Sequence, residues 1–185
     1  IEHSDRKVRV EPPNKGVVRI EGGAVVVTDE WEGGLEIAGL LNAEAAPVEY
    51  WAFDRWEITY AAPNPSATAA NITLLKQDEE ELVAYFVPID LAVYVPTAFS
   101  PNNDGLNDAF MPVGTSFVAE TYHLIVINRW GEKVFESFDP KEPWIGQHQG
   151  GAHFVRDGQY MYRLEVQSVH EMVPRSYTGS VTVVR

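Results

Sequence analysis

Apolar and polar residues alternate along most of the chain with a period of two, which is the period of β-strands and not of helices. In residues 1–92 this pattern, rich in β-branched and aromatic residues, predicts strands at 8–10, 17–20, 24–28, 50–60 and 82–87. Turn sequences at 12–16 and 21–23 separate the first three strands, which are therefore expected to pair as hairpins. A single short helix is predicted, around residues 35–46.

In residues 93–185 the pattern predicts a strand at 122–127 that is apolar on both faces. Alternation places Tyr122, Leu124 and Val126 on one face, and His123, Ile125 and Ile127 on the other. Such a strand is expected to be central and covered on both sides. Residues 128–132 include Gly131, which tolerates a positive φ, so residues 133–136 can return as an antiparallel partner. Short strands with regular turns predict an immunoglobulin-like β-sandwich of about seven strands.

The length of 185 residues suits two small domains, and we place them at 1–92 and 93–185. Seven Lys or Arg stand against seventeen Asp or Glu through Ala92, and seven against ten from Val93 onward. The net charge of −13 argues against nucleic acid or an anionic membrane as partner, because both require basic surfaces. The chain has no cysteine, so neither disulfides nor thiolate metal sites hold the fold.

No apolar run approaches the roughly 20 residues that a membrane-spanning helix needs, so no span is predicted. The chain begins with Ile1 and has neither an initiator Met nor a charged-then-apolar leader. We therefore expect it to be a piece of a longer protein whose signal peptide was lost with the rest.

The loop 102–108 is the first candidate for chemistry, because carboxylates and amides are closely spaced there. Asn102, Asp104 and Asp108 are the candidate ligands for a calcium ion. Calcium takes six to eight oxygens, however, and the run lacks a terminal bidentate Glu. A turn whose Asn and Asp side chains bond their own backbone is the favoured alternative, and no other cofactor is predicted.

The aromatic residues offer a second candidate, a platform that stacks on sugars. Trp51 and Phe53 fall on one face of the predicted strand and Trp56 on the other. This favours packing in the core over a ligand platform, because aromatic side chains bury a large apolar area. The same interpretation is given to Trp130 and Trp144.

The remaining polar clusters do not predict catalysis. His148 and His153 lack a third ligand of suitable spacing, which favours a solvated loop over a zinc site. Asp54 with Glu57, and the acidic run 78–81, are interpreted as solvated faces. Because no nucleophile elbow, phosphate loop or metalloprotease motif is present in the sequence, we predict that the chain is not an enzyme.

Three blocks in the second half carry a resemblance to a known family. Their order and spacing are those of the type B, gliding-motility-associated C-terminal sorting domain of the type IX secretion system of Bacteroidetes. The matching residues are Pro101, Asn102, Asp104, Gly105, Asn107 and Asp108, then Asn128, Arg129, Trp130 and Gly131, then Asp157, Gly158 and Tyr160. The final residues 179–185 resemble the family's closing strand and basic terminus. One departure is Trp144-Ile145-Gly146, where the family usually has an acidic residue between Trp and Gly.

The resemblance implies an immunoglobulin-like domain that directs export of a larger cargo through the periplasm and across the outer membrane. The cargo would then be extracellular or attached to the cell surface. The implied partners are the type IX translocon and its outer-membrane shuttle or anchoring proteins. Because a sandwich has open strand edges, we hypothesise that a partner strand pairs with Val181, Thr182, Val183, Val184 and Arg185.

Residues 7–87 carry a looser resemblance to the divergent internalin-type bacterial repeat. It rests on residues 8–12, 16–18, 50–56 and 82–86, which follow the order of that repeat. The resemblance implies a small β-grasp-like spacer domain of a surface protein, and the insertion at 29–39 departs from it. The alternative function is an extracellular carbohydrate-binding or adhesin module that uses the Trp-rich first half.

Overall fold

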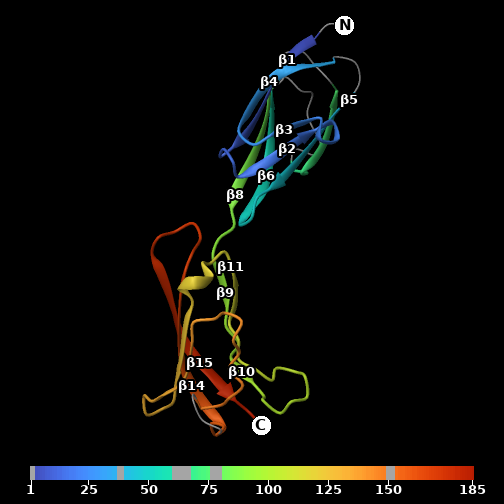
Figure 1. The fold of residues 1–185 in the computed structure, drawn as a ribbon. Coiled ribbons are helices and arrows are strands. Elements are labelled where there is room, and N and C mark those ends of the chain that lie inside the picture. The colour runs from blue at the N-terminus through green and yellow to red at the C-terminus, as the bar shows by residue number, and fades with distance from the viewer. Residues whose placement is uncertain (1–2, 37–39, 60–67, 76–80, 149–152) are drawn as a thin grey trace. The chain divides into compact units, whose positions relative to one another are not determined.

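In the computed structural model, residues 3–36, 40–59, 68–75, 81–148 and 153–185 are described. The chain forms two compact units, Ile1–Ile89 (unit 1) and Asp90–Arg185 (unit 2). The sequence placed this boundary slightly later, between Ala92 and Val93. Among the described residues, the short 3-10 turns η1 (Glu21–Gly23) and η2 (Ala119–Thr121) are the only helical segments. The prediction of an all-β protein is therefore confirmed (Figure 1).

The described residues of unit 1 form two four-stranded sheets. The first has the strand order β4 (Glu30–Glu36), β1 (His3–Glu11), β8 (Glu81–Pro88), β6 (Trp51–Thr59). The second has the order β3 (Val25–Val27), β2 (Gly16–Ile20), β5 (Leu40–Pro47), β7 (Asn71–Leu75). All neighbours are antiparallel except β1 and β8, which are parallel. Apolar side chains from both sheets share one core, so unit 1 is a small sandwich.

The connections in unit 1 differ in part from the predicted hairpins. β2 and β3 pair across the turn 21–23, as predicted. β1 and β2 lie in different sheets, so the hairpin expected across 12–16 does not form. The buried residues of β1, such as Val8 and Val10, meet those of β2 across the core and not side by side. A turn sequence shows that the chain reverses, but not which sheet the next strand enters.

The helix predicted around residues 35–46 was wrong, because β4 and β5 occupy the described part of this range. In β5, Leu41, Ala43 and Ala45 are buried and the residues between them are exposed. This is the period of a strand with one buried face, and burial of that face overrides the helix propensity of Leu and Ala. With two facing sheets, unit 1 also differs from the β-grasp-like domain that the resemblance implies.

A β-bulge in β6 decides which aromatic side chains face the core of unit 1. The register of β6 on β8 shifts between Phe53 and Arg55, which leaves Asp54 as an extra residue. The extra residue reverses the alternation, so Phe53 and Trp56 share a face, with their ring centroids 5.6 Å apart. Trp56 is buried, and Trp51 and Phe53 pack against the same core. Core packing is confirmed, whereas placing Trp56 on the opposite face was wrong.

Unit 2 has seven strands in its described part. Five form a sheet in the order β10 (Ala98–Phe99), β15 (Pro174–Val183), β14 (Gly158–Gln167), β12 (His123–Ile127), β13 (Lys133–Ser137). β10 runs parallel to β15 and the other neighbours are antiparallel. β9 (Ala92–Tyr94) and β11 (Val113–Thr115) form a separate two-stranded ribbon. The ribbon packs near Leu164 and Val166 of β14 and near Tyr122, which precedes β12, and this makes two layers and the predicted sandwich.

The hairpin at the centre of unit 2 follows the sequence pattern closely. β12 lies between β13 and β14 and pairs antiparallel with both, as expected of a central strand. Leu124 and Val126 of β12, and Tyr122 just before it, are buried, and the alternate residues of the strand are half-buried. Asn128 and Gly131 close the turn to β13 with a 3.0 Å backbone hydrogen bond.

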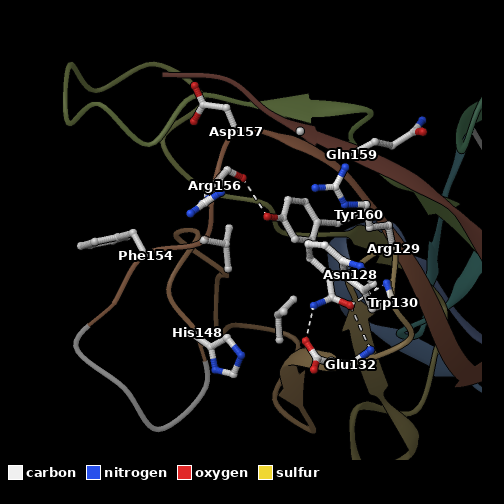
Figure 2. A pocket seen from close by; sticks show the side chains of 13 residues that line it. Asn128, Arg129, Trp130, Glu132, His148, Phe154, Arg156, Asp157, Gln159 and Tyr160 are labelled. Atoms are coloured by element: carbon white, nitrogen blue, oxygen red, sulfur yellow. Dashed lines mark hydrogen bonds between the residues drawn. The ribbon is translucent and has the colours of Figure 1, made fainter.

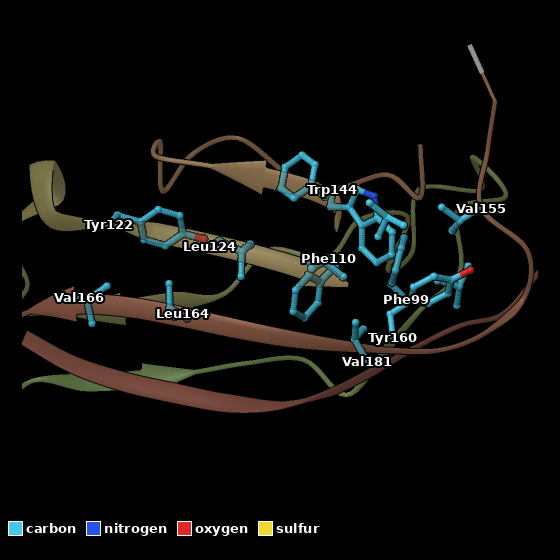
Figure 3. Close-up of a cluster of buried hydrophobic side chains, with 14 of the residues drawn as sticks. Phe99, Phe110, Tyr122, Leu124, Trp144, Val155, Tyr160, Leu164, Val166 and Val181 are labelled. Atoms are coloured by element: carbon cyan, nitrogen blue, oxygen red, sulfur yellow. The ribbon is translucent and has the colours of Figure 1, made fainter. Parts of the chain in front are cut away.

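The fully buried indole of Trp144 lies among aromatic side chains in one part of the core of unit 2 (Figure 3). Its ring centroid lies 5.2 Å from that of Phe99, 5.4 Å from Tyr160, 6.2 Å from Phe135 and 6.4 Å from Phe110. The backbones of Trp144 and Phe110 also exchange two hydrogen bonds, of 2.8 and 2.9 Å. The prediction that Trp144 packs in the core is confirmed.

Replacing Trp144 with Ala is expected to lower the free energy of unfolding of unit 2 by about 3–5 kcal/mol, because it leaves a cavity among the neighbouring rings. The matched control is Trp130→Ala, at a side chain that is 70% exposed, with an expected change within about 0.5 kcal/mol. Urea unfolding of the whole chain, followed through the NMR amide signals of β12 and β14, measures both changes. Equal losses in the two variants would contradict the packing of Trp144 in the core.

Candidate functional site

Several loops of unit 2 meet at one end of its sheet. β10 and β15 end there and β14 begins there, because Phe99 and Gly158 both pair with Val183. β12 ends close by, since its last residue, Ile127, pairs with Met161 near the start of β14. The family-motif residues identified in the sequence therefore gather at this end. The loops concerned, named the loop end below, are 100–108, 128–132 and 153–157.

Loop 100–108 is held in place by its own side chains. The carboxylate of Asp108 accepts two backbone N–H groups, at 2.6 and 2.7 Å. The carboxylate of Asp104 accepts the side-chain amide of Asn102 at 2.9 Å and the backbone N–H of Leu106 at 2.8 Å. These are the bonds of an Asx-type turn, which the sequence favoured for this loop.

The candidate calcium ligands are the same groups that close this turn. Oxygens of Asp104 and Asp108 already accept hydrogen bonds, so a cation would have to compete with the backbone for them. Within the described ranges, no group of three or more His, Cys, Asp or Glu side chains is arranged to hold a metal ion. The calcium site of Asn102, Asp104 and Asp108 stays a prediction.

Some residues of the turn 128–132 hold its backbone in place, and others extend from it into solvent. The side-chain oxygen of Asn128 accepts the N–H groups of Trp130 at 2.9 Å and Glu132 at 3.0 Å, and its amide donates to Glu132 at 2.7 Å. Gly131 adopts φ 82°, a conformation that costs other residues free energy. The guanidinium of Arg129 stacks on the indole of Trp130 at 4.4 Å, and both side chains are exposed. The prediction that Trp130 packs in the core was therefore wrong.

The segment 153–160 is tied to the C-terminal residue. Arg185 donates to the carbonyl of Val155 at 2.8 Å and pairs with the carboxylate of Asp157 at 3.0 Å. The hydroxyl of Tyr160 donates to the carbonyl of Arg156 at 2.7 Å. Two motif residues, Asp157 and Tyr160, thus fix the path of this segment.

A cavity of about 340 Å³ lies between the turn 128–132 and the segment 153–160 (Figure 2). Buried side chains of Val134, Val155 and Tyr160 contribute to its lining. Its exposed lining residues include Arg129, Trp130, Phe154 and Arg156. Sequence reasoning found two of these four and missed Phe154 and Arg156, which lie just before the motif residue Asp157.

Residues 181–185 do not present the open strand edge that was predicted. On one side of β15, Thr182 donates to the carbonyl of Thr97 at 2.9 Å, and Val184 donates to that of Phe99 at 3.1 Å. On the other side, β15 pairs with β14 as far as Val183. This segment therefore completes the sheet, because β10 covers the edge that the sequence alone left open. Residues 174–180 of β15 pair only with β14 among the described strands.

The other candidate residues do not form a second site in the described part of the chain. His148 and His153 are exposed and joined by a 2.8 Å backbone hydrogen bond, as in a solvated loop. Asp54 and Glu57 both bind Arg55 on the surface of unit 1. Of the acidic run 78–81, residues 78–80 lie outside the described residues and Glu81 pairs with Arg9 at 3.1 Å.

Comparison with protein families identifies unit 2. Residues 93–183 match the family model described as the CHU_C type IX secretion signal domain. The resemblance seen in the sequence is confirmed, and with it a sorting-signal role in export by the type IX secretion system. Such a signal implies interaction with the secretion system and delivery to the cell surface or the extracellular space. This family is not known as enzymatic.

Curated proteins and solved structures give no further indication of function. No curated protein matches the chain. A leucine-rich repeat protein from Bacteroides thetaiotaomicron is a structural match, with 10% identity, a TM-score of 0.25 and coverage of 98% of this chain. The chain spans 24% of that protein's length. None of the helices in the described residues is long and apolar enough to cross a membrane.

The hydrogen bonds of Asp104 in loop 100–108 are expected to make the stability of the fold depend on pH. The side-chain amide of Asn102, and next the N–H of Leu106, lower the pKa of Asp104 below its ordinary value of 3.8. These bonds therefore stabilise the fold fully above the ordinary pKa, and the contribution is lost as the pH falls through the lower, folded-state value. We expect Asn102→Ala to raise the pKa of Asp104, measured by NMR titration of its carboxyl carbon. The control Leu106→Ala keeps the backbone N–H and should leave that pKa in place; an unchanged pKa in Asn102→Ala would refute the contact.

Proposed function

We propose that residues 93–183, as the type IX secretion signal domain of a longer protein, are recognised through the loop end. The recognising partners are the outer-membrane translocon and its shuttle or anchoring proteins. One observation carries the proposal: three motif blocks that lie far apart in the sequence meet at one end of the domain. A folded domain that gathers its characteristic residues in this way offers a single surface to a partner.

The turn 128–132 contains residues that form it and other residues that are only exposed on it, which supports recognition by a partner at the loop end. Asn128 and Gly131 contribute to building the turn, because Asn128 accepts two backbone hydrogen bonds in it and Gly131 provides its positive φ. Arg129 and Trp130 make no comparable contribution to the turn, yet they are exposed and belong to the motif. Trp and Arg are also the residue types that most often dominate the affinity of protein interfaces.

Unit 1 is proposed to act as a spacer between the cargo and the signal domain. It has its own hydrophobic core, and its aromatic side chains Trp51, Phe53 and Trp56 pack in or against that core. They are therefore poorly placed to stack on a sugar, which weighs against a carbohydrate-binding module. We propose that the cargo passes through the periplasm, remains attached to the cell surface after export, and that this part of the protein has no catalytic role.

The proposal predicts that residues 93–185 suffice for export. A signal peptide, a fluorescent reporter and residues 93–185 are fused and expressed in a gliding bacterium with a type IX system and in a translocon-deficient strain. We expect the reporter outside the wild-type cells and in the periplasm of the deficient strain. Cell fractionation and fluorescence of intact cells and medium provide the measurement.

The matched control carries residues 1–185 behind the same reporter and should be exported to the same extent if unit 1 is a spacer. Periplasmic retention of the short fusion alone would show that unit 1 is part of the signal. Retention of both fusions in wild-type cells, with both shown to be folded, would refute the sorting proposal.

A further inference from the structure

We propose that the cavity at the loop end binds an extended acidic segment of a type IX secretion partner protein, which presents a carboxylate next to an apolar side chain. This inference rests on the proposed function, because it assumes that the loop end is the surface that the secretion system recognises. It adds the chemistry of what is recognised and the residues that recognise it.

The charges around the cavity favour an anionic ligand. The two acids that line it are engaged within unit 2: Glu132 accepts from Asn128 at 2.7 Å, and Asp157 pairs with Arg185 at 3.0 Å. Arg129 and Arg156 line the same cavity and have no ion pair among the described residues. Of the five other Lys and Arg residues of unit 2, Lys133, Arg163, Arg175 and Arg185 do have one, and Lys141 does not. Two of the three Lys or Arg residues of unit 2 without an ion pair among the described residues therefore line this one cavity, in a strongly acidic chain.

The geometry of Arg129 suits a carboxylate in particular. Its guanidinium lies over the ring of Trp130 at 4.4 Å, so the indole supports one face of the group. The N–H groups point outward in the plane of the guanidinium, and stacking leaves them free to donate two parallel hydrogen bonds to one carboxylate. Stacking also restricts the side chain before binding, which reduces the entropy lost on binding.

The apolar part of the ligand follows from the rest of the lining. Trp130 and Phe154 are 70% and 60% exposed, and Val134, Val155 and Tyr160 lie buried beneath the cavity. A volume of about 340 Å³ is at the lower end of the range of about 300–1,000 Å³ for ligand pockets. An aromatic or aliphatic side chain beside the carboxylate would cover these exposed rings.

A protein segment fits these features better than a membrane surface does. Binding to anionic lipid usually requires a cluster of about four to eight basic residues, and here two free arginines flank one cavity. The net charge of −13 would also repel an anionic bilayer. Binding of an acidic protein segment requires only the two arginines at the cavity. The negative charge on the rest of the chain repels such a segment and so disfavours its binding anywhere else on the surface.

The first test is charge reversal in the export assay, with the full chain 1–185 behind the reporter. Arg129→Glu with Arg156→Glu is expected to reduce export by about tenfold or more, because it replaces both free cations with repelling charges. The matched control, Lys141→Glu with Arg175→Glu, makes the same change in net charge outside the cavity and should be exported normally. If the Glu variant does not fold by NMR, Arg129→Gln with Arg156→Gln replaces it, with the same expectation.

The outcomes separate this inference from the proposed function. Export of the double Arg variant at the wild-type level would overturn the inference and leave the sorting role intact. Equal loss in the variant and the control would also overturn it, because net charge would then be the cause. Retention of the unaltered chain would refute the sorting role itself.

The second test identifies the class of ligand. The photoreactive substitution Phe154→p-benzoylphenylalanine in the full chain keeps an aromatic ring at the rim and crosslinks whatever lies in the cavity during export. Mass spectrometry is expected to find a segment of a secretion-system protein with Asp or Glu beside an apolar residue, and the crosslink should disappear in the Arg129→Glu, Arg156→Glu background. A crosslink to lipid, to glycan or to a segment without Asp or Glu would overturn the inference.

Discussion

The packing of aromatic rings around Trp144 is the interaction on which the loop end depends. Each of three loops is followed or preceded closely by a ring that touches this indole: Phe99 before loop 100–108, Phe135 after the turn 128–132, and Tyr160 after the segment 153–157. The indole N–H also donates to the carbonyl of Gln147 at 2.8 Å. One buried side chain therefore helps to hold all three loops in position.

The family-motif residues serve two different physical purposes. Some build backbone, as Asp104 and Asp108 do through side-chain hydrogen bonds and Gly131 does through its positive φ. Others, such as Arg129 and Trp130, project from the backbone so formed. A rigid turn that displays a stacked Arg–Trp pair costs little entropy when a partner binds, so the two groups of residues act together in recognition.

A β-bulge in unit 1 and a short parallel strand in unit 2 each decide which residues of that unit are exposed. In unit 1 the extra residue Asp54 turns Phe53 and Trp56 to the same face, and this places both aromatic rings at the core. In unit 2 the short parallel strand β10 covers the end of β15, so residues 181–183 are inner and not edge residues. Both features are set by pairing between segments distant in sequence, yet they decide which side chains and backbone groups remain available to a partner.

The sequence by itself determined the all-β class, the central hairpin 122–136 and the signal-domain family, because a period of two, turn residues and dispersed motifs are local properties of the chain. It also determined the Asx turn of loop 100–108, whose bonds join residues a few positions apart. Only the tertiary structure decided that Trp130, unlike Trp144, is exposed, that strands replace the predicted helix in the described part of 35–46, and that Phe154 and Arg156 line the same cavity as Arg129. These outcomes depend on which distant segments become neighbours, and the burial and pairing of a residue are properties of those neighbours as much as of the residue itself.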